Sequence, residues 1–151
     1  MRYYEYHTMA ILAENKRALF DYEILGAFEA GIVLKGYEAK AVTSGRVNLS
    51  GSYASLVRGE LWIVNLDIPP YQPKNIPGLY DPKRSRKLLV TKSELDELIG
   101  KTKGLTLIPM KMYSKRGKIK LEIGLAKSRK KKDKREVIKQ RETQKEIKRF
   151  I

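Results

Sequence analysis

The sequence has no cysteine, a single histidine and no long apolar run. Without cysteine, disulfides, cysteine-ligated zinc and thiol catalysis are excluded. His7 alone cannot supply a histidine-based acid–base pair, and Glu29, Glu38 and Asp81 are too scattered to indicate a magnesium-dependent nuclease. No segment approaches the roughly 20 apolar residues that span a bilayer, and the N-terminus lacks the apolar core of a secretory signal. We expect a cytoplasmic protein that is not an enzyme and needs no metal or cofactor.

Negative charge is also scarce, because 17 acidic residues face 32 lysines and arginines, for a net charge of +15. Residues 127–151 hold 12 basic and 4 acidic side chains, and the remaining +7 belongs to residues 1–126. A tail with this much charge cannot bury enough apolar surface to offset the entropy lost on ordering. We therefore expect it to be disordered in the free protein. A basic domain (1–126) followed by a basic tail (127–151) points to nucleic acid as the partner.

Alternating apolar and polar residues predict antiparallel strands in the second half of the domain. Residues 119–125 alternate cleanly, and Leu105–Tyr113 forms a second strand joined to them through a turn at 114–117. Pro109 lies inside that second strand, which suggests an edge position or a bulge. These two segments therefore predict a hairpin with one charged face.

A second hairpin and one helix are predicted nearby. The turn at 58–60 separates Tyr53–Val57 from Leu61–Ile68, and even-numbered apolar residues of the latter (Trp62 to Ile68) would share one face. Thr91 and Glu94 form a capping box that begins a helix, with Gly100 placed as the residue after its end. Several short antiparallel strands with one or two helices predict a small barrel, and barrels of the OB type are a common scaffold for RNA binding.

A proline-bearing loop from Pro69 to Arg86 precedes that helix, and long loops of this kind are often functional. It ends in a cluster of basic residues, which are Lys83, Arg84, Arg86 and Lys87. We expect this cluster to contact RNA phosphates, which positions an RNA without reading its sequence. A solvated surface is the alternative interpretation.

Six short segments, in order along the chain, carry a resemblance to a known family. They are Glu14–Ala18, Phe28–Ile32, Gly36–Lys40, Ser52–Ala54, Asp81–Leu89 and Ala126–Arg135. Together they resemble small protein B, the SsrA-binding protein family of bacteria, from about Ile11 to the C-terminus. The resemblance implies a mainly β fold: an OB-like, closed antiparallel barrel of about six strands with a few short helices, and no enzymatic activity.

The resemblance also implies partners. Members of the family bind the tRNA-like domain of transfer-messenger RNA and promote its delivery to stalled ribosomes during trans-translation. The tail enters the vacant messenger channel near the decoding centre of the small subunit. Elongation factor Tu with GTP and, indirectly, alanyl-tRNA synthetase act on the same RNA, and no membrane is involved.

Residues that match the family's RNA-contacting segments are Asn15, Lys16, Arg17, Glu29 and Leu89. Asn15 carries both a donor and an acceptor for a base edge, although an asparagine here could instead form a turn. The Glu29 carboxylate repels phosphate but can accept from a base amino group or a ribose 2′-OH, and a surface salt bridge is the alternative. Either Leu88 or Leu89 must point inward, so Leu89 could be a core residue.

The tail positions implied to contact the ribosome are Lys130, Lys131, Lys132, Asp133, Lys134, Arg135 and Ile147. On a helix, Ile147 would share a narrow apolar stripe with Val137, Phe150 and Ile151, so we expect helix to form when the tail binds RNA. Ser128 replaces the glycine that is usual at the tail entrance, and Lys132 stands where some relatives have a stacking residue. A basic ribosomal protein or a generic single-stranded RNA-binding OB protein would share the charge pattern.

Overall fold

Six antiparallel strands close into a ring in the computed structural model, which describes residues 9–72, 78–129, 135 and 138. The strands in chain order are β1 (Met9–Glu14), β2 (Tyr22–Ile32), β3 (Tyr53–Val57), β4 (Glu60–Val64), β5 (Arg86–Leu89), β6 (Thr106–Lys115) and β7 (Lys118–Ser128). The helices are α2 (Ala18–Asp21), α3 (Gly36–Thr43) and α4 (Lys92–Lys101).

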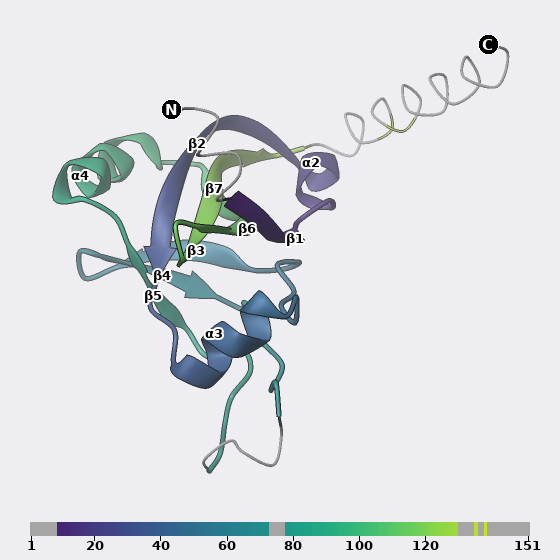
Figure 1. Ribbon diagram of the computed structural model, residues 1–151. Helices are drawn as coiled ribbons and strands as arrows, with labels where there is room; N and C mark the ends of the chain where they lie inside the picture. The colour runs from purple at the N-terminus through teal and green to yellow at the C-terminus, as the bar shows by residue number, and fades with distance from the viewer. Residues whose placement is uncertain (1–8, 73–77, 130–134, 136–137, 139–151) are drawn as a thin grey trace, which may run out of the picture.

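The ring runs β6-β3-β4-β5-β2-β7 and closes through pairing of β6 with β7 (Figure 1). β1 is a seventh strand, which pairs with the second half of β6. Closure removes the unpaired edges of the six ring strands, and edges are where open sheets associate. The predicted OB-like barrel of about six strands with a few short helices is confirmed.

The core fills the inside of this ring, because residues of one parity along a strand point inward wherever the strand is regular. Ile63 on β4, Met112 on β6 and Ile123 on β7 are fully buried within one apolar cluster. α3, below the barrel in Figure 1, adds Val42 to that cluster, and α4, at its upper left, adds Leu98. Apolar burial is the main force that holds the ring and these helices together.

Both predicted hairpins are present, each with a two-residue turn. Arg58 and Gly59 join β3 to β4 with φ values of 52° and 76°, and Arg116 and Gly117 join β6 to β7 with 52° and 75°. Two successive residues with positive φ match the twist of the flanking strands, and glycine adopts that conformation without strain. Pro109 lies at a register shift in β6, so it marks a bulge and not an edge.

The prediction that the even-numbered residues from Trp62 to Ile68 share one face is wrong. Leu61 and Ile63 point inward in β4, and after Asn65, whose φ is 62°, Leu66 and Ile68 are the buried residues. The left-handed conformation of Asn65 ends the strand alternation, so residues on its two sides do not share one face.

The helix start predicted at Thr91 is confirmed, because its hydroxyl accepts a hydrogen bond from the Glu94 amide at 3.2 Å. The predicted end is wrong by two residues. Gly100 lies inside α4, which continues to Lys101 with Thr102 as its C-cap. Gly104, with a φ of 79°, makes the later left-handed turn instead.

Candidate RNA interface

The outer surface of four neighbouring ring strands brings together two of the predicted RNA-contacting residues. Cross-strand pairing places Leu89 of β5 beside Gly31 of β2, and Gly31 beside Lys120 of β7. Glu29 lies two residues before Gly31 and therefore on the same outer face. Residues 60 positions apart in the chain thus share one face. We call this surface the Glu29 face; its residues are Glu29, Leu89, Lys111, Tyr113, Lys115, Lys120 and Glu122.

Leu89 is an outward residue of β5, with 52% of its surface exposed, while Leu88 is buried in the core. A Cβ at position 31 would lie 3.3 Å from the Cβ of Leu89 and 3.6 Å from Nζ of Lys120. Glycine at this position lets both side chains lie directly over the β2 backbone. The alternative that Leu89 is a core residue is therefore excluded, and an apolar side chain is presented beside an ammonium group.

The Glu29 carboxylate is held by two side chains of β6. The Tyr113 hydroxyl donates a hydrogen bond to its Oε2, and Nζ of Lys115 lies 3.6 Å from the same oxygen. Burial and the adjoining Glu29 carboxylate raise the pKa of the Tyr113 hydroxyl, so it stays protonated as a donor. The Glu29 side chain still has 40% of its surface exposed and can accept a further hydrogen bond.

Five members of the Glu29 face were not predicted from the sequence as RNA-contacting residues: Lys111, Tyr113, Lys115, Lys120 and Glu122. Lys111 forms an ion pair with Glu122 across β6 and β7, with an N–O distance of 3.6 Å. Four of the five lie in predicted strands and Lys115 lies in the predicted turn, so alternation indicated part of this surface. The register between β2, β7 and β6, which places them beside Glu29, has no local signature.

The predicted basic cluster in the 69–86 loop does not lie open to solvent as a unit. Arg86 is fully buried: its Nε donates to Glu38 Oε2 at 2.7 Å and its Nη1 to the Leu66 carbonyl at 2.6 Å. The prediction that Arg86 contacts phosphate is therefore wrong. The charge run looked solvent-exposed in sequence, but the fold uses Arg86 to neutralise a buried acid from α3.

Arg84 joins the same acid, since its Nε and Nη2 both donate to the Glu38 carboxylate. Its side chain is 28% exposed, and the contact with Glu38 raises the pKa of its guanidinium. Lys83 is exposed, and Lys87 is partly exposed beside Glu60 at 3.4 Å. These two lysines are the residues of the predicted cluster whose ammonium groups can reach a phosphate.

Asn15 lies at the reversal between β1 and α2 and is largely buried. Its side-chain amide donates to the Pro109 carbonyl at 3.0 Å, and its backbone N–H donates to the Met110 carbonyl at 2.8 Å. The Asn15 carbonyl also accepts from the Ala18 N–H at 3.2 Å, so Asn15 begins a turn, while its side chain fastens that turn to β6. Lys16 and Arg17 follow on the surface, and Arg17 forms an ion pair with Asp21 at 3.3 Å.

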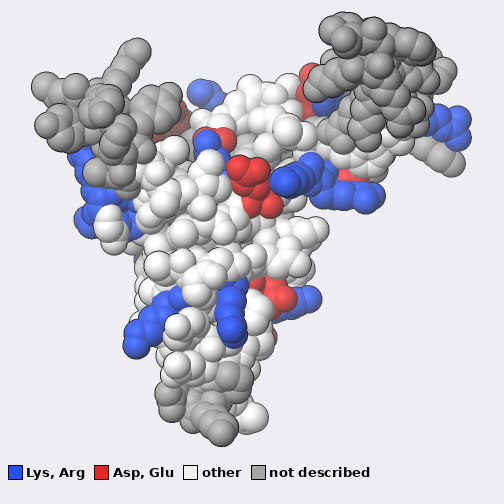
Figure 2. All heavy atoms as spheres, turned by 45° about the vertical axis from the view of Figure 1, so that its right-hand side comes forward, with Lys and Arg blue, Asp and Glu red and all other residues white. Residues whose placement is uncertain are grey.

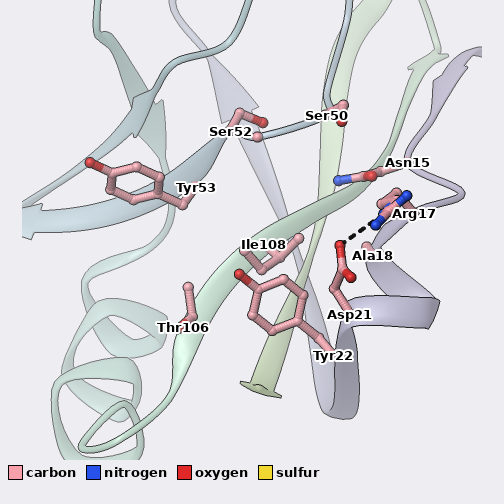
Figure 3. A pocket seen from close by; sticks show the side chains of 11 residues that line it. Asn15, Arg17, Ala18, Asp21, Tyr22, Ser50, Ser52, Tyr53, Thr106 and Ile108 are labelled. Carbon is pink, nitrogen blue, oxygen red and sulfur yellow. Dashed lines mark hydrogen bonds and ion pairs between the residues drawn. The ribbon is translucent and has the colours of Figure 1, made fainter. Parts of the chain in front are cut away.

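Asn15 also borders a cleft of about 420 Å³ between α2, the 50–53 segment and β6, which we call the Asn15 cleft (Figure 3). The Tyr22 ring faces this cleft together with Ser50 and Ser52, whereas Tyr53 lines its edge and its ring points away from the other lining residues. Tyr53 itself is 40% exposed. Aromatic faces with hydrogen-bonding groups nearby are what an unstacked base requires.

The chain leaves the barrel beside this cleft. Ser128 ends β7 paired with Tyr22, and the Arg129 backbone N–H donates to the Asp21 carbonyl at 2.9 Å. Ser128 is extended, so the glycine usual there is not needed for a left-handed backbone. Arg135 and Ile138 are helical and exposed. The other predicted tail residues, Lys130–Lys134 and Ile147, lie outside the described residues.

Basic side chains form separate groups on the face seen in Figure 2, with acidic side chains beside several of them. Over residues 9–72 and 78–129, together with 135 and 138, no three His, Cys, Asp or Glu residues gather as a metal site would require. Within those same residues no helix is long and apolar enough to cross a membrane.

Comparisons with known proteins agree on one family. The family model described as SmpB protein matches residues 12–151. The SsrA-binding protein of Carboxydothermus hydrogenoformans is 50% identical over 143 residues, covering 93% of this chain and 95% of the relative, and that of Thermosynechococcus vestitus is 44% identical over 146 residues, covering 95% and 96%. A solved structure described as "tmRNA-SmpB: a journey to the center of the bacterial ribosome" is 46% identical, with a TM-score of 0.65, and the match covers 83% of this chain and 93% of that one. The chain belongs to the SmpB protein family.

Proposed function

We propose that this protein is an RNA-binding adaptor for ribosome rescue, which binds the tRNA-like domain of transfer-messenger RNA and promotes its delivery to stalled ribosomes. The observation that carries the proposal is family membership over almost the whole chain, with relatives named for binding SsrA RNA. The RNA arrives with elongation factor Tu and GTP after charging by alanyl-tRNA synthetase. The protein itself performs no chemistry in this role.

Two parts of the chain divide the work in this proposal. The barrel binds transfer-messenger RNA through the Glu29 face, where a carboxylate, an exposed leucine and lysines lie together. The tail enters the vacant messenger channel near the decoding centre of the small subunit. We place the start of the tail after Arg129, because β7 continues to Ser128 and Arg129 is still bound to Asp21.

The Asn15 cleft supplies a second RNA-contacting site within the same proposal. Asn15, Lys16 and Arg17 lie at the mouth of this cleft or beside it, next to the point where the tail leaves the barrel. A base that stacks there on Tyr22 would come from the RNA that the tail also contacts. This arrangement gives the protein one RNA surface on the ring strands and another at the tail exit.

The proposal predicts selective binding. The purified protein should bind the tRNA-like domain of transfer-messenger RNA more tightly than total tRNA in an electrophoretic assay over a salt series. Each phosphate neutralised should add a slope of roughly −0.7 to −0.9 to log K against log salt. Equal affinity for both RNAs at physiological salt would contradict the proposal and favour a generic RNA-binding protein. Stoichiometric recovery with all ribosomes would instead favour a ribosomal protein.

A pair of variants should separate phosphate contact from recognition. Lys83→Ala should weaken binding to every RNA alike and reduce the salt slope by about 1, because a phosphate contact carries no sequence information. Glu29→Ala should instead weaken binding mainly to transfer-messenger RNA, by a factor that corresponds to about 1–3 kcal/mol, and leave the slope unchanged. Titrating each variant against both RNAs checks this, and a Glu29→Ala loss that is the same for both would refute the assignment.

A further inference from the structure

The ring of Tyr113 is fixed in the surface of β6. Only 5% of the residue is exposed, and Nζ of Lys111 lies 5.9 Å from the ring centroid. Strand pairing places Ile11 of β1 on one side of Tyr113 and Lys120 of β7 on the other. A ring that is enclosed in this way cannot stack on an RNA base. The hydroxyl is the part of Tyr113 that contacts another residue of the Glu29 face.

The contact of the Tyr113 hydroxyl with Glu29 joins two strands that are not neighbours in the ring. β6 and β2 both pair with β7, so Tyr113 and Glu29 come from strands about 10 Å apart, twice the usual strand spacing. The Tyr113 hydroxyl nevertheless donates to Glu29, and Nζ of Lys115 approaches the same carboxylate. Both groups contact Oε2, and none of the described residues donates a hydrogen bond to Oε1.

We infer that Tyr113 is a positioning residue, whose hydroxyl fixes the Glu29 carboxylate so that Oε1 accepts a hydrogen bond from one nucleotide of the bound RNA. This inference rests on the proposed function and names the chemistry of one contact within it. A flexible glutamate would have to be ordered when RNA binds, whereas this carboxylate is already ordered in the folded protein. Tyr113 itself does not touch the RNA.

The ligand must be a hydrogen-bond donor, because an ionised carboxylate only accepts. RNA offers two such sources, the exocyclic amino group of a base and the ribose 2′-OH. A phosphate is disfavoured there, because two anions repel each other. The lysines of the Glu29 face provide charge balance around a contact that is itself selective.

A double-mutant cycle of Tyr113→Phe and Glu29→Ala tests the inference. Phenylalanine keeps the buried ring and removes only the hydroxyl, so denaturant unfolding of the variant should stay close to that of the original protein. Tyr113→Phe should weaken binding of the tRNA-like domain about ten-fold, the effect of one hydrogen bond to a charged group. In the Glu29→Ala background the same change should have no further effect, and the salt slope should not move.

The outcomes distinguish this inference from the proposed function. A Tyr113→Phe loss that persists in the Glu29→Ala background would indicate a purely structural role, and unchanged binding would refute any role; both overturn the inference while the proposed function stands. If the original protein does not prefer the tRNA-like domain to tRNA, the proposed function fails, and the inference with it. A ten-fold loss that vanishes in the Glu29→Ala background supports both.

Nucleotide-analogue interference identifies the donor. Transcripts of the tRNA-like domain would carry either 2′-deoxynucleotides or bases that lack the exocyclic amino group, namely inosine, purine riboside and pyrimidin-2-one riboside. One position should interfere with binding to the original protein and not with binding to Glu29→Ala. Interference by the deoxynucleotide indicates the 2′-OH, and interference by the base analogue indicates the amino group. No position that depends on Glu29 in either set would overturn the inference.

Discussion

Replacing Glu38 by alanine is expected to lower the free energy of unfolding by about 3–5 kcal/mol, the usual cost of removing one partner from a buried ion pair. Glu38 is fully buried in α3 and accepts hydrogen bonds from both Arg84 and Arg86. Arg86 is also fully buried, so the variant leaves its guanidinium charge inside the protein without a counter-charge. The Leu66 carbonyl would remain bound to it but carries no charge.

The size of this effect follows from how many parts of the chain meet at Glu38. The Tyr80 hydroxyl donates to the Ile68 carbonyl at 2.8 Å and accepts from Nη2 of Arg86 at 3.1 Å. The rings of Tyr80 and Tyr37 pack edge to face with centroids 5.2 Å apart. The cluster therefore joins α3, the end of the 69–86 loop and β5, and its loss should loosen all three.

Glu60→Ala is the matched control. Glu60 pairs with Lys87 at 3.4 Å, and both side chains are more than 40% exposed, so solvent screens the pair. Its removal should change the free energy of unfolding by less than about 1 kcal/mol. Denaturant unfolding of the two variants measures the difference. Similar losses for Glu38→Ala and Glu60→Ala would contradict the assignment of stability to the buried cluster.

The contribution of Glu38 should also depend on pH. Burial by itself raises the pKa of the Glu38 carboxyl, but hydrogen bonds from Arg84, the Lys35 amide and Arg86 outweigh it, so the pKa lies below its ordinary value of 4.5. A lowered pKa stabilises the folded state above pH 4.5, and this stability is lost as pH falls through the folded-state pKa. The difference between the original protein and Glu38→Ala should shrink when unfolding is measured at progressively more acidic pH.

The buried cluster around Glu38 could not be predicted from the sequence pattern. Lys83 to Lys87 looked like one exposed basic run, since four cations in five residues have no local partner. The partner of Arg86 is 48 residues away, and only folding brings α3 against β5. By contrast, the two hairpins and the helix start at Thr91 depend on contacts within a few residues, and those the sequence pattern predicts correctly.

The Glu29 face likewise depends on strand register, which the local sequence pattern does not determine. Alternation indicated that either Leu88 or Leu89 faces inward but could not choose between them, because the choice depends on the register of β5 with β2. Glu29 and Leu89 entered through family resemblance, without a reason for their being together. The register supplies that reason and adds Tyr113, whose hydroxyl reaches Glu29 over an intervening strand.

Removing residues 130–151 is expected to abolish tagging on stalled ribosomes and to leave binding of the tRNA-like domain nearly unchanged. The structure sets the point of truncation. Cutting at 127 would remove the pairing of Ser128 with Tyr22 and both hydrogen bonds of Arg129, through its backbone N–H to Asp21 and its Nε to the Tyr22 carbonyl. A chain that ends at Arg129 keeps the complete β7 and the Asn15 cleft, so any loss belongs to the tail alone.

The removed segment is strongly basic, so charge must be separated from sequence. Binding is compared at physiological ionic strength, where the screening length of about 8 Å suppresses long-range attraction between the tail and an RNA bound at the Glu29 face. A variant with residues 130–151 in scrambled order keeps length and charge but disperses Asp133, Lys134 and Arg135. We expect it to bind transfer-messenger RNA normally and to fail in a reconstituted tagging assay. Full tagging by the scrambled chain would mean that any basic tail suffices, and full tagging by the truncated chain would end the proposed division between barrel and tail.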